Sequence, residues 1–207
     1  MKNYFIFALV LAIFGLTGVN AQESETNDNA DFSRWQARLR VISIIPSEGD
    51  DIDGADVEIS TAFVPELDFT YFFDENWAAE LILGTAKHNV DVEDTDLGHV
   101  WLLPPTLNLQ YHFDAGGVSP YLGAGVNYTI FYGVDAGDVV DLDYENSFGF
   151  SFQAGVDIDL DEKWFINIDA KKILLKTDVD VDTGEGVLPV EVEINPFVVG
   201  AGVGLRF

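Results

Sequence analysis

The feature that most constrains this chain is an alternation of apolar with polar or small residues. At the C-terminal end, the odd positions from 197 to 207 are all apolar, and glycine recurs at 200, 202 and 204. A period of two places successive side chains on opposite faces of a β-strand. The pattern predicts eight strands, at about 35–46, 57–73, 77–87, 107–113, 122–130, 148–160, 164–175 and 197–207.

The connections between these strands alternate in length. Segments 74–76, 114–119 and 161–163 are tight turns, whereas 47–56, 88–99, 131–146 and 176–190 are long. A tilted strand needs roughly 9–11 residues to cross a bilayer, and outer-membrane barrels combine short turns at one end with long loops at the other. We therefore expect an all-β fold over residues 35–207, an eight-stranded antiparallel transmembrane barrel with short periplasmic turns and long extracellular loops.

Charge and apolar residues are both abundant, so they must be segregated. The chain has 36 acidic and 10 basic residues, and 48% of its residues are hydrophobic. Half of the acids fall in the four long segments, and the apolar residues fall on strand faces. The net charge of −26 argues against a nucleic-acid partner, which needs clustered Lys and Arg. The absence of cysteine excludes disulfides and thiolate metal sites.

The N-terminal end has the layout of a secretory signal peptide. A positive start precedes an apolar run over 4–16, and Val19 and Ala21 are the small residues expected before a cleavage site. The run is shorter than the ~20 residues of a spanning helix. We expect a signal peptide over 1–21, cleaved after Ala21, then a periplasmic tail over 22–34. The predicted location is the outer membrane of a Gram-negative-type cell envelope.

Three motifs resemble the outer membrane protein W (OmpW) family. Residues 100–113 (VWLLPPTLNLQYHF) are similar to its LPPT signature, 120–129 (PYLGAGVNYT) to its PYxGAGxNYT strand, and 195–207 (NPFVVGAGVGLRF) to its C-terminal end. Leu205 replaces the usual Tyr, and the loops are unusually acidic. The resemblance implies an eight-stranded barrel with a narrow apolar channel. It also implies that small hydrophobic molecules pass inward and leave sideways into the membrane.

The inward-facing residues predict a lumen of two parts. Buried charges must pair, so the charged residues of the periplasmic half predict an ion-paired plug. These are Arg38, Arg40, Glu66, Asp68, Glu80, His112, Asp157, Asp159 and Arg206. The extracellular half predicts an apolar ligand path, formed by Ile42, Ile44, Val64, Ile82 and Ile173. The alternative is a structural, adhesive or receptor barrel whose interior is filled by side chains and whose external loops are acidic.

Three prolines interrupt predicted strands, namely Pro65, Pro104 and Pro105. Proline has no N–H for the hydrogen-bond ladder, so it is confined to edges, bulges or gaps. We hypothesise that these prolines loosen the wall and form a lateral gate. A kink without a gating role is the alternative.

The sequence offers no arrangement for catalysis or for a metal ion. His88, His99 and His112 lack metal-ligand spacing and are interpreted as surface residues. Residues 178–185 resemble a calcium loop only superficially, because Thr183 and Pro189 stand where an EF-hand needs Gly and Glu. No Ser, His and carboxylate trio converges by strand parity. We expect no enzyme activity, no cofactor and no metal.

Aromatic residues near the short turns predict a membrane-interface girdle. They are Trp35, Tyr71, Trp77, Tyr111, Phe113, Tyr121, Trp164 and Phe207. The expected partners are outer-membrane lipids and lipopolysaccharide, small hydrophobic solutes, and the barrel assembly machinery, which would recognise the C-terminal Phe207. The sequence leaves the oligomeric state open.

Overall fold

The computed structural model describes residues 33–46, 57–92 and 95–207. The predicted signal peptide, all but the last two residues of the predicted tail, and the predicted loop 47–56 lie outside the described residues. Within the described part of the chain, no helix is long and apolar enough to cross a membrane.

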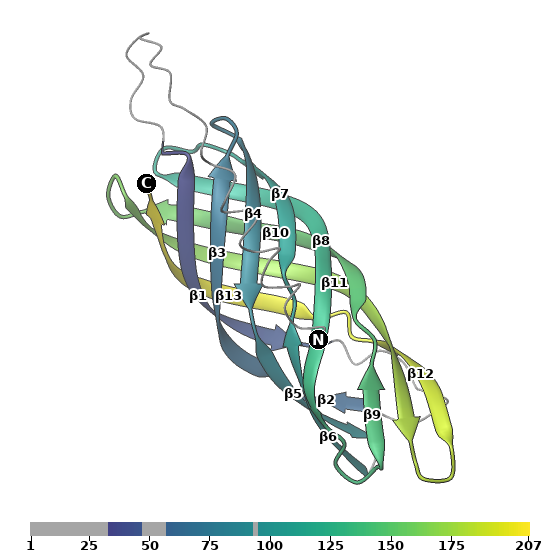
Figure 1. The fold of residues 1–207 in the computed structure, drawn as a ribbon. Coiled ribbons are helices and arrows are strands. Elements are labelled where there is room, and N and C mark those ends of the chain that lie inside the picture. The colour runs from purple at the N-terminus through teal and green to yellow at the C-terminus, as the bar shows by residue number, and fades with distance from the viewer. Residues whose placement is uncertain (1–32, 47–56, 93–94) are drawn as a thin grey trace, which may run out of the picture. The chain divides into compact units, whose positions relative to one another are not determined.

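Eight strands close into a ring in which every neighbour is antiparallel (Figure 1). Each strand pairs with the next, and the last pairs with the first. Closure gives each of these eight strands a partner on both sides, which is what an all-β chain needs in lipid. In ring order they are β1 (Trp35–Ile45), β3 (Ala62–Phe72), β4 (Trp77–Gly84), β7 (Thr106–His112), β8 (Val118–Asp135), β10 (Ser147–Asp159), β11 (Trp164–Asp182) and β13 (Phe197–Arg206).

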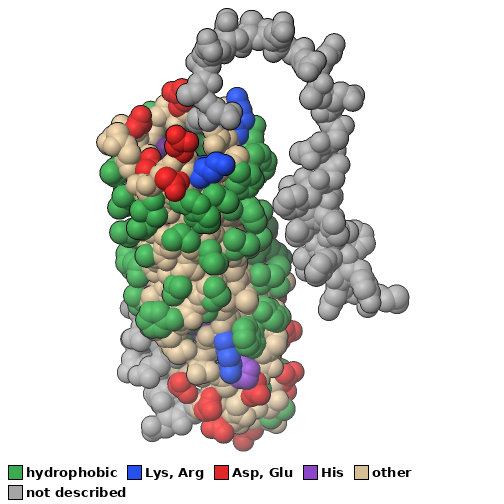
Figure 2. Space-filling model, turned by 90° about the vertical axis from the view of Figure 1, so that its left-hand side faces the viewer, with side chains coloured by type: hydrophobic (Ala, Val, Ile, Leu, Met, Phe, Trp, Pro, Cys, Tyr) green, Lys and Arg blue, Asp and Glu red, His purple; other side chains and the backbone are tan. Residues whose placement is uncertain are grey.

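The alternation predicted from the sequence agrees with the burial pattern of the strands. In β10, Phe150 and Phe152 are more than half exposed, whereas Ser151 between them is fully buried. Outward-facing apolar side chains form a broad band on the face seen in Figure 2, and Asp and Glu gather at its two ends. We call this band the apolar belt. It is the surface that a bilayer covers, because lipid-facing and lumen-facing residues alternate along each strand of a membrane barrel and the lipid-facing ones are apolar.

The strands continue beyond the apolar belt as a β-structured extension, opposite the end that holds the short turns and the C-terminus (Figure 1). The extension corrects the prediction that 88–99, 131–146 and 176–190 are long loops, since most of these residues are in strands. The extension comprises the C-terminal parts of β8 and β11 and five further strands. These are β2 (Val57–Ile59), β5 (Ala86–Val92), β6 (Thr95–Leu103), β9 (Asp141–Tyr144) and β12 (Val187–Glu193).

The physical reason is that the period of two persists through the acidic segments. On β11, Val179 is buried, and Asp178 and Asp180 on either side are exposed. The inner face of the extension therefore stays apolar while its outer face carries the carboxylates. The outward residues of β5 are also polar (Lys87, Asn89 and Asp91), which places β5 outside the apolar belt.

The predicted aromatic girdle forms at the turn end, with one exception. Trp35 packs on Tyr71 with ring centroids 4.8 Å apart, and Trp77 packs on Tyr111 at 5.0 Å. Tyr121 is only 1% exposed, so its assignment to the girdle was wrong. It directly precedes the outward-facing Leu122, and its side chain therefore points into the lumen.

Candidate functional site

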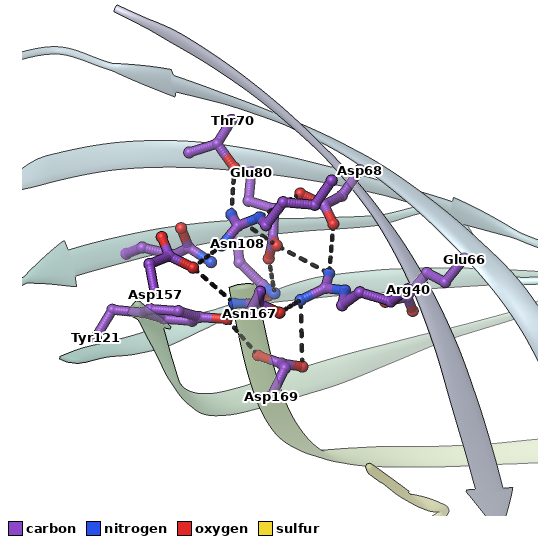
Figure 3. A network of polar contacts seen from close by, with 12 residues as sticks. Arg40, Glu66, Asp68, Thr70, Glu80, Asn108, Tyr121, Asp157, Asn167 and Asp169 are labelled. Atoms are coloured by element: carbon purple, nitrogen blue, oxygen red, sulfur yellow. Dashed lines mark hydrogen bonds and ion pairs between the residues drawn. The ribbon is translucent and has the colours of Figure 1, made fainter. Parts of the chain in front are cut away.

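The half of the lumen nearest the short turns, which we call the lower lumen, is filled by a buried network of charged and amide side chains (Figure 3). Arg38 lies on β1 and is fully buried. Its guanidinium contacts Asp68 Oδ1 at 2.8 Å, Glu80 Oε1 at 3.2 Å and Asp157 Oδ1 at 3.5 Å. These carboxylates come from β3, β4 and β10, so this one side chain ties four strands together across the barrel.

Arg40, two residues further along β1, makes a second set of contacts on the same inward face. Its Nε lies 2.9 Å from Glu66 Oε1, and its Nη2 lies 2.7 Å from Asp68 Oδ2 and 3.1 Å from Glu80 Oε1. Asp68 and Glu80 are thus shared between the two arginines. Sharing of this kind is the arrangement in which desolvated charges are compensated by several partners each.

The structure adds polar residues that sequence reasoning did not assign to the lumen. Lys171 Nζ lies 2.8 Å from Glu66 and 2.9 Å from Asp169. The Tyr121 hydroxyl donates a hydrogen bond to Asp169 Oδ2 at 2.7 Å, and Asn167 donates one to Tyr121 at 2.9 Å. Asn167, Asp169 and Lys171 share the strand parity of Ile173, which was predicted to face inward, so the signal for them was present.

We define the plug as Arg38, Arg40, Lys171, Glu66, Asp68, Glu80, Asp157 and Asp169, together with Tyr121 and Asn167. Every one of these residues is at least 95% buried. Of the predicted plug residues, Asp159 and Arg206 lie apart from this network. They pair with each other at 2.7 Å near the turn end, where their side chains are 33% and 17% exposed.

Above the plug, toward the extension, lies a cavity of about 310 Å³. Its lining includes all five residues of the predicted ligand path, Ile42, Ile44, Val64, Ile82 and Ile173. The extension adds further apolar residues to the lining, so the cavity reaches beyond the apolar belt: Val90, Val100, Leu102, Val179, Val181, Leu188, Val190 and Val192. Glu66 and Lys171 form the boundary with the plug.

The barrel wall is interrupted beside this cavity. The β3–β4 ladder ends at Glu66–Gly84, next to Pro65, and backbone hydrogen bonding resumes between Ser60 and Asn89, beside the Ile59–Val90 pair. On the other side, Pro104 and Pro105 separate β6 from β7. We call residues 84–85 with these three prolines the wall break.

The cavity reaches the wall break from inside. Gly84, Thr85 and Pro104 line the cavity, although Thr85 is exposed on the outer surface. Pro65 and Pro105 belong to the break but do not line the cavity. The Thr85 hydroxyl bridges the break by donating to the Leu102 carbonyl at 3.0 Å, and it also lies 2.6 Å from the Tyr132 hydroxyl.

Two histidines that were interpreted as surface residues are buried. His88 and His112 are each 4% exposed. His112 stacks on Tyr121 with ring centroids 4.9 Å apart, and its Nε2 lies 3.0 Å from Gln110 Oε1. His88 lines the cavity. The surface interpretation was therefore wrong for both residues, whereas the assignment of His112 to the inward face of its strand agrees with its burial.

Comparison with known proteins gives a consistent match. The OmpW family model matches residues 35–207. The chain is 41% identical to the outer-membrane protein y4mB of Sinorhizobium fredii, over 97% of this chain and 92% of that protein. It is 29% identical to the dibenzothiophene metabolism operon protein PahQ of Pseudomonas aeruginosa, over 86% and 90% of the two chains.

Among solved structures, the outer membrane protein OprG of Pseudomonas aeruginosa superposes with a TM-score of 0.77 at 27% identity, covering 84% of this chain and 95% of OprG. The eight-stranded ring, its apolar belt and its inward plug thus belong to an outer-membrane barrel, with the short turns on the periplasmic side. Because the family model covers the whole barrel, the chain belongs to the OmpW family.

Proposed function

We propose that this barrel carries small hydrophobic molecules into the outer membrane. The molecule enters the cavity from the extracellular side and leaves sideways through the wall break into the lipid. The observation that carries this proposal is the apolar cavity of about 310 Å³ above a closed plug. Ligand pockets for small molecules start at about 300 Å³.

The plug supports a sideways exit over a straight path. Eight buried charged side chains close the lower lumen, and an apolar molecule that crossed them would have to displace their ion pairs. Separating such pairs without replacement costs several kcal/mol. The wall break lies at cavity height, and its prolines lack the N–H groups that would otherwise seal the ladder.

The character of one relative supports a hydrophobic cargo. PahQ is named as a protein of a dibenzothiophene metabolism operon, and dibenzothiophene is an apolar aromatic compound. The chain belongs to a non-enzymatic family, which supports a binding and passage site over a catalytic one.

The barrel lies in outer-membrane lipid. We propose further that the extension contacts lipopolysaccharide, whose headgroups begin where the apolar belt ends. We also propose that the assembly machinery recognises Phe207, which is 59% exposed at the end of β13.

A cavity-blocking variant tests the transport proposal. Ile82→Trp places an indole in the cavity, whereas Leu81→Trp, on the neighbouring outward-facing position, is the matched control. We expect Ile82→Trp to abolish most of the barrel-dependent uptake of naphthalene into cells, and Leu81→Trp to preserve it. Unchanged uptake in Ile82→Trp would favour the structural, adhesive or receptor alternative.

The lateral exit needs a separate test. Replacing Pro104 and Pro105 together with Val restores two backbone N–H groups beside the wall break. We expect cavity binding of naphthalene to persist and its uptake to fall severalfold. Uptake at the wild-type rate would mean that the prolines only shape the strand.

A further inference from the structure

One polar side chain of the cavity has a ring nitrogen that makes no hydrogen bond to the described residues. His88 lies on β5, is 4% exposed and lines the cavity. Its Nδ1 lies 2.7 Å from the Ser60 carbonyl oxygen. A carbonyl oxygen can only accept, so Nδ1 carries the hydrogen and donates it.

This contact fixes the chemistry of the other nitrogen. Burial lowers the pKa of His88 below its usual value, so the ring is neutral at neutral pH. In a neutral imidazole with its hydrogen on Nδ1, Nε2 is a hydrogen-bond acceptor. Within the described part of the chain, no hydrogen bond reaches Nε2.

The surroundings of His88 are apolar and aromatic. His88 pairs with Val100 across the β5–β6 ladder. Val100 packs with Val90 and Leu102 in a cluster that Phe131 and Tyr144 cover. The rings of Phe131 and Tyr144 stack with centroids 5.4 Å apart at 19°. An acceptor beside such a wall suits a flat apolar molecule that carries a hydrogen-bond donor.

Most other polar groups of the cavity are already engaged with each other. Asn127 donates to Thr106 Oγ1 at 2.7 Å and accepts from Thr129 at 2.7 Å. Lys171 and Glu66 form an ion pair. His88 therefore differs from them in offering a lone pair that no described protein group uses.

We propose that His88 Nε2 determines specificity by accepting a hydrogen bond from the transported molecule. The favoured class is small aromatic compounds with one hydroxyl or N–H group, over isosteric hydrocarbons and ethers. This inference rests on the proposed function, because it concerns which hydrophobic molecules the cavity prefers.

Three naphthalene derivatives of similar size test the inference, namely 2-naphthol, 2-methylnaphthalene and 2-methoxynaphthalene. Each competes with the fluorescent compound N-phenyl-1-naphthylamine for the protein refolded in lipid nanodiscs, and the readout is the ratio of their displacement constants. Partition into lipid is the same for every variant, so it cancels when the ratios are compared. In the wild type we expect 2-naphthol to bind about three- to tenfold tighter than the other two compounds, the range of one net hydrogen bond.

The variant His88→Phe removes the acceptor and keeps an aromatic ring. We expect it to abolish the preference for 2-naphthol while 2-methylnaphthalene binds within about twofold of wild type. His99→Phe is the matched control, because His99 lies on β6 and does not line the cavity. It should keep the wild-type preference.

The outcomes separate this inference from the proposed function. A preference that survives in His88→Phe overturns the inference and leaves transport intact. If that variant fails to fold, the wild type alone decides, because equal binding of 2-naphthol and 2-methoxynaphthalene, each corrected for its partition into protein-free nanodiscs, also overturns it. If none of the three displaces the fluorophore from wild type, the proposed function itself fails.

Discussion

Arg40→Met is the sharpest test of the claim that the plug is held together by shared ion pairs. The substitution keeps an unbranched apolar side chain of similar reach and removes the guanidinium. Arg40 contacts Glu66, Asp68 and Glu80 within 3.1 Å and donates to Asn167 Oδ1 at 3.2 Å. Its side chain has no exposed surface, so no solvent replaces these contacts.

The expected magnitude follows from the charge left behind. The plug has three cations, Arg38, Arg40 and Lys171, against five carboxylates. Removing one partner of a buried ion pair costs about 3–5 kcal/mol because the remaining charge is uncompensated. We expect the free energy of unfolding to fall by about that amount.

The assay is urea unfolding from lipid vesicles, followed by tryptophan fluorescence and by electrophoretic mobility without heating. Arg206→Met is the matched control, because Arg206 pairs with Asp159 at 2.7 Å at a partly exposed site. A partly exposed pair contributes at most about 1 kcal/mol.

The double variant Arg40→Met with Glu80→Gln removes one charge of each sign. We expect it to be more stable than Arg40→Met alone, because fewer carboxylates are left uncompensated. Equal stability losses for Arg40→Met and Arg206→Met would refute the ion-paired plug as a stabilising unit.

Three further predictions concern the wall, a turn and the C-terminus. Gly202→Ala should lower the free energy of unfolding by about 1–3 kcal/mol, because its Cβ would lie 2.0 Å from the Leu39 carbonyl oxygen. Gly186→Ala is the control, because a Cβ at that position meets nothing within 4 Å. Equal urea midpoints for the two variants would contradict this prediction. Asp74 Oδ1 accepts hydrogen bonds from the backbone N–H groups of Trp77 and Asn76, which lower the pKa of Asp74. The ionised Asp74 carboxylate therefore stabilises the folded barrel above the carboxyl pKa of the unfolded chain, and this stabilisation is lost as pH falls through the pKa of the folded state. In urea titrations, Asp74→Ala should lower the free energy of unfolding at pH 7 and should change it little below the pKa of the folded state. Deleting Phe207 should lower the amount of barrel in the outer membrane severalfold while purified protein still refolds; wild-type amounts in membrane fractions would exclude its role in assembly.

Strand parity accounts for most of what the sequence predicts correctly. The alternation around Phe150 and Leu109 places these residues outside and their neighbours inside, as the structure has them. The same rule would have found Asp169 and Lys171, which precede the inward Ile173 by four and two positions. It would also have found Tyr121, which was assigned to the girdle because of its residue type and not its parity.

What the sequence does not predict is which inward residues meet across the lumen. Tyr121 on β8 reaches Asp169 on β11, and Arg38 on β1 reaches Asp157 on β10. These contacts depend on the stagger of the closed ring, which links strands distant along the chain. The length of the extension was also missed, because acidic residues at 178, 180 and 182 disguised a continuing strand.

The filled lower lumen has a consequence for the permeability of the cell envelope. A wide water-filled pore admits ions and small hydrophilic compounds, so each copy of such a pore adds to leakage across the membrane. Here the plug residues, which come from six strands, occupy the lower passage. We therefore expect many copies of this barrel to add little to the leak of ions across the outer membrane.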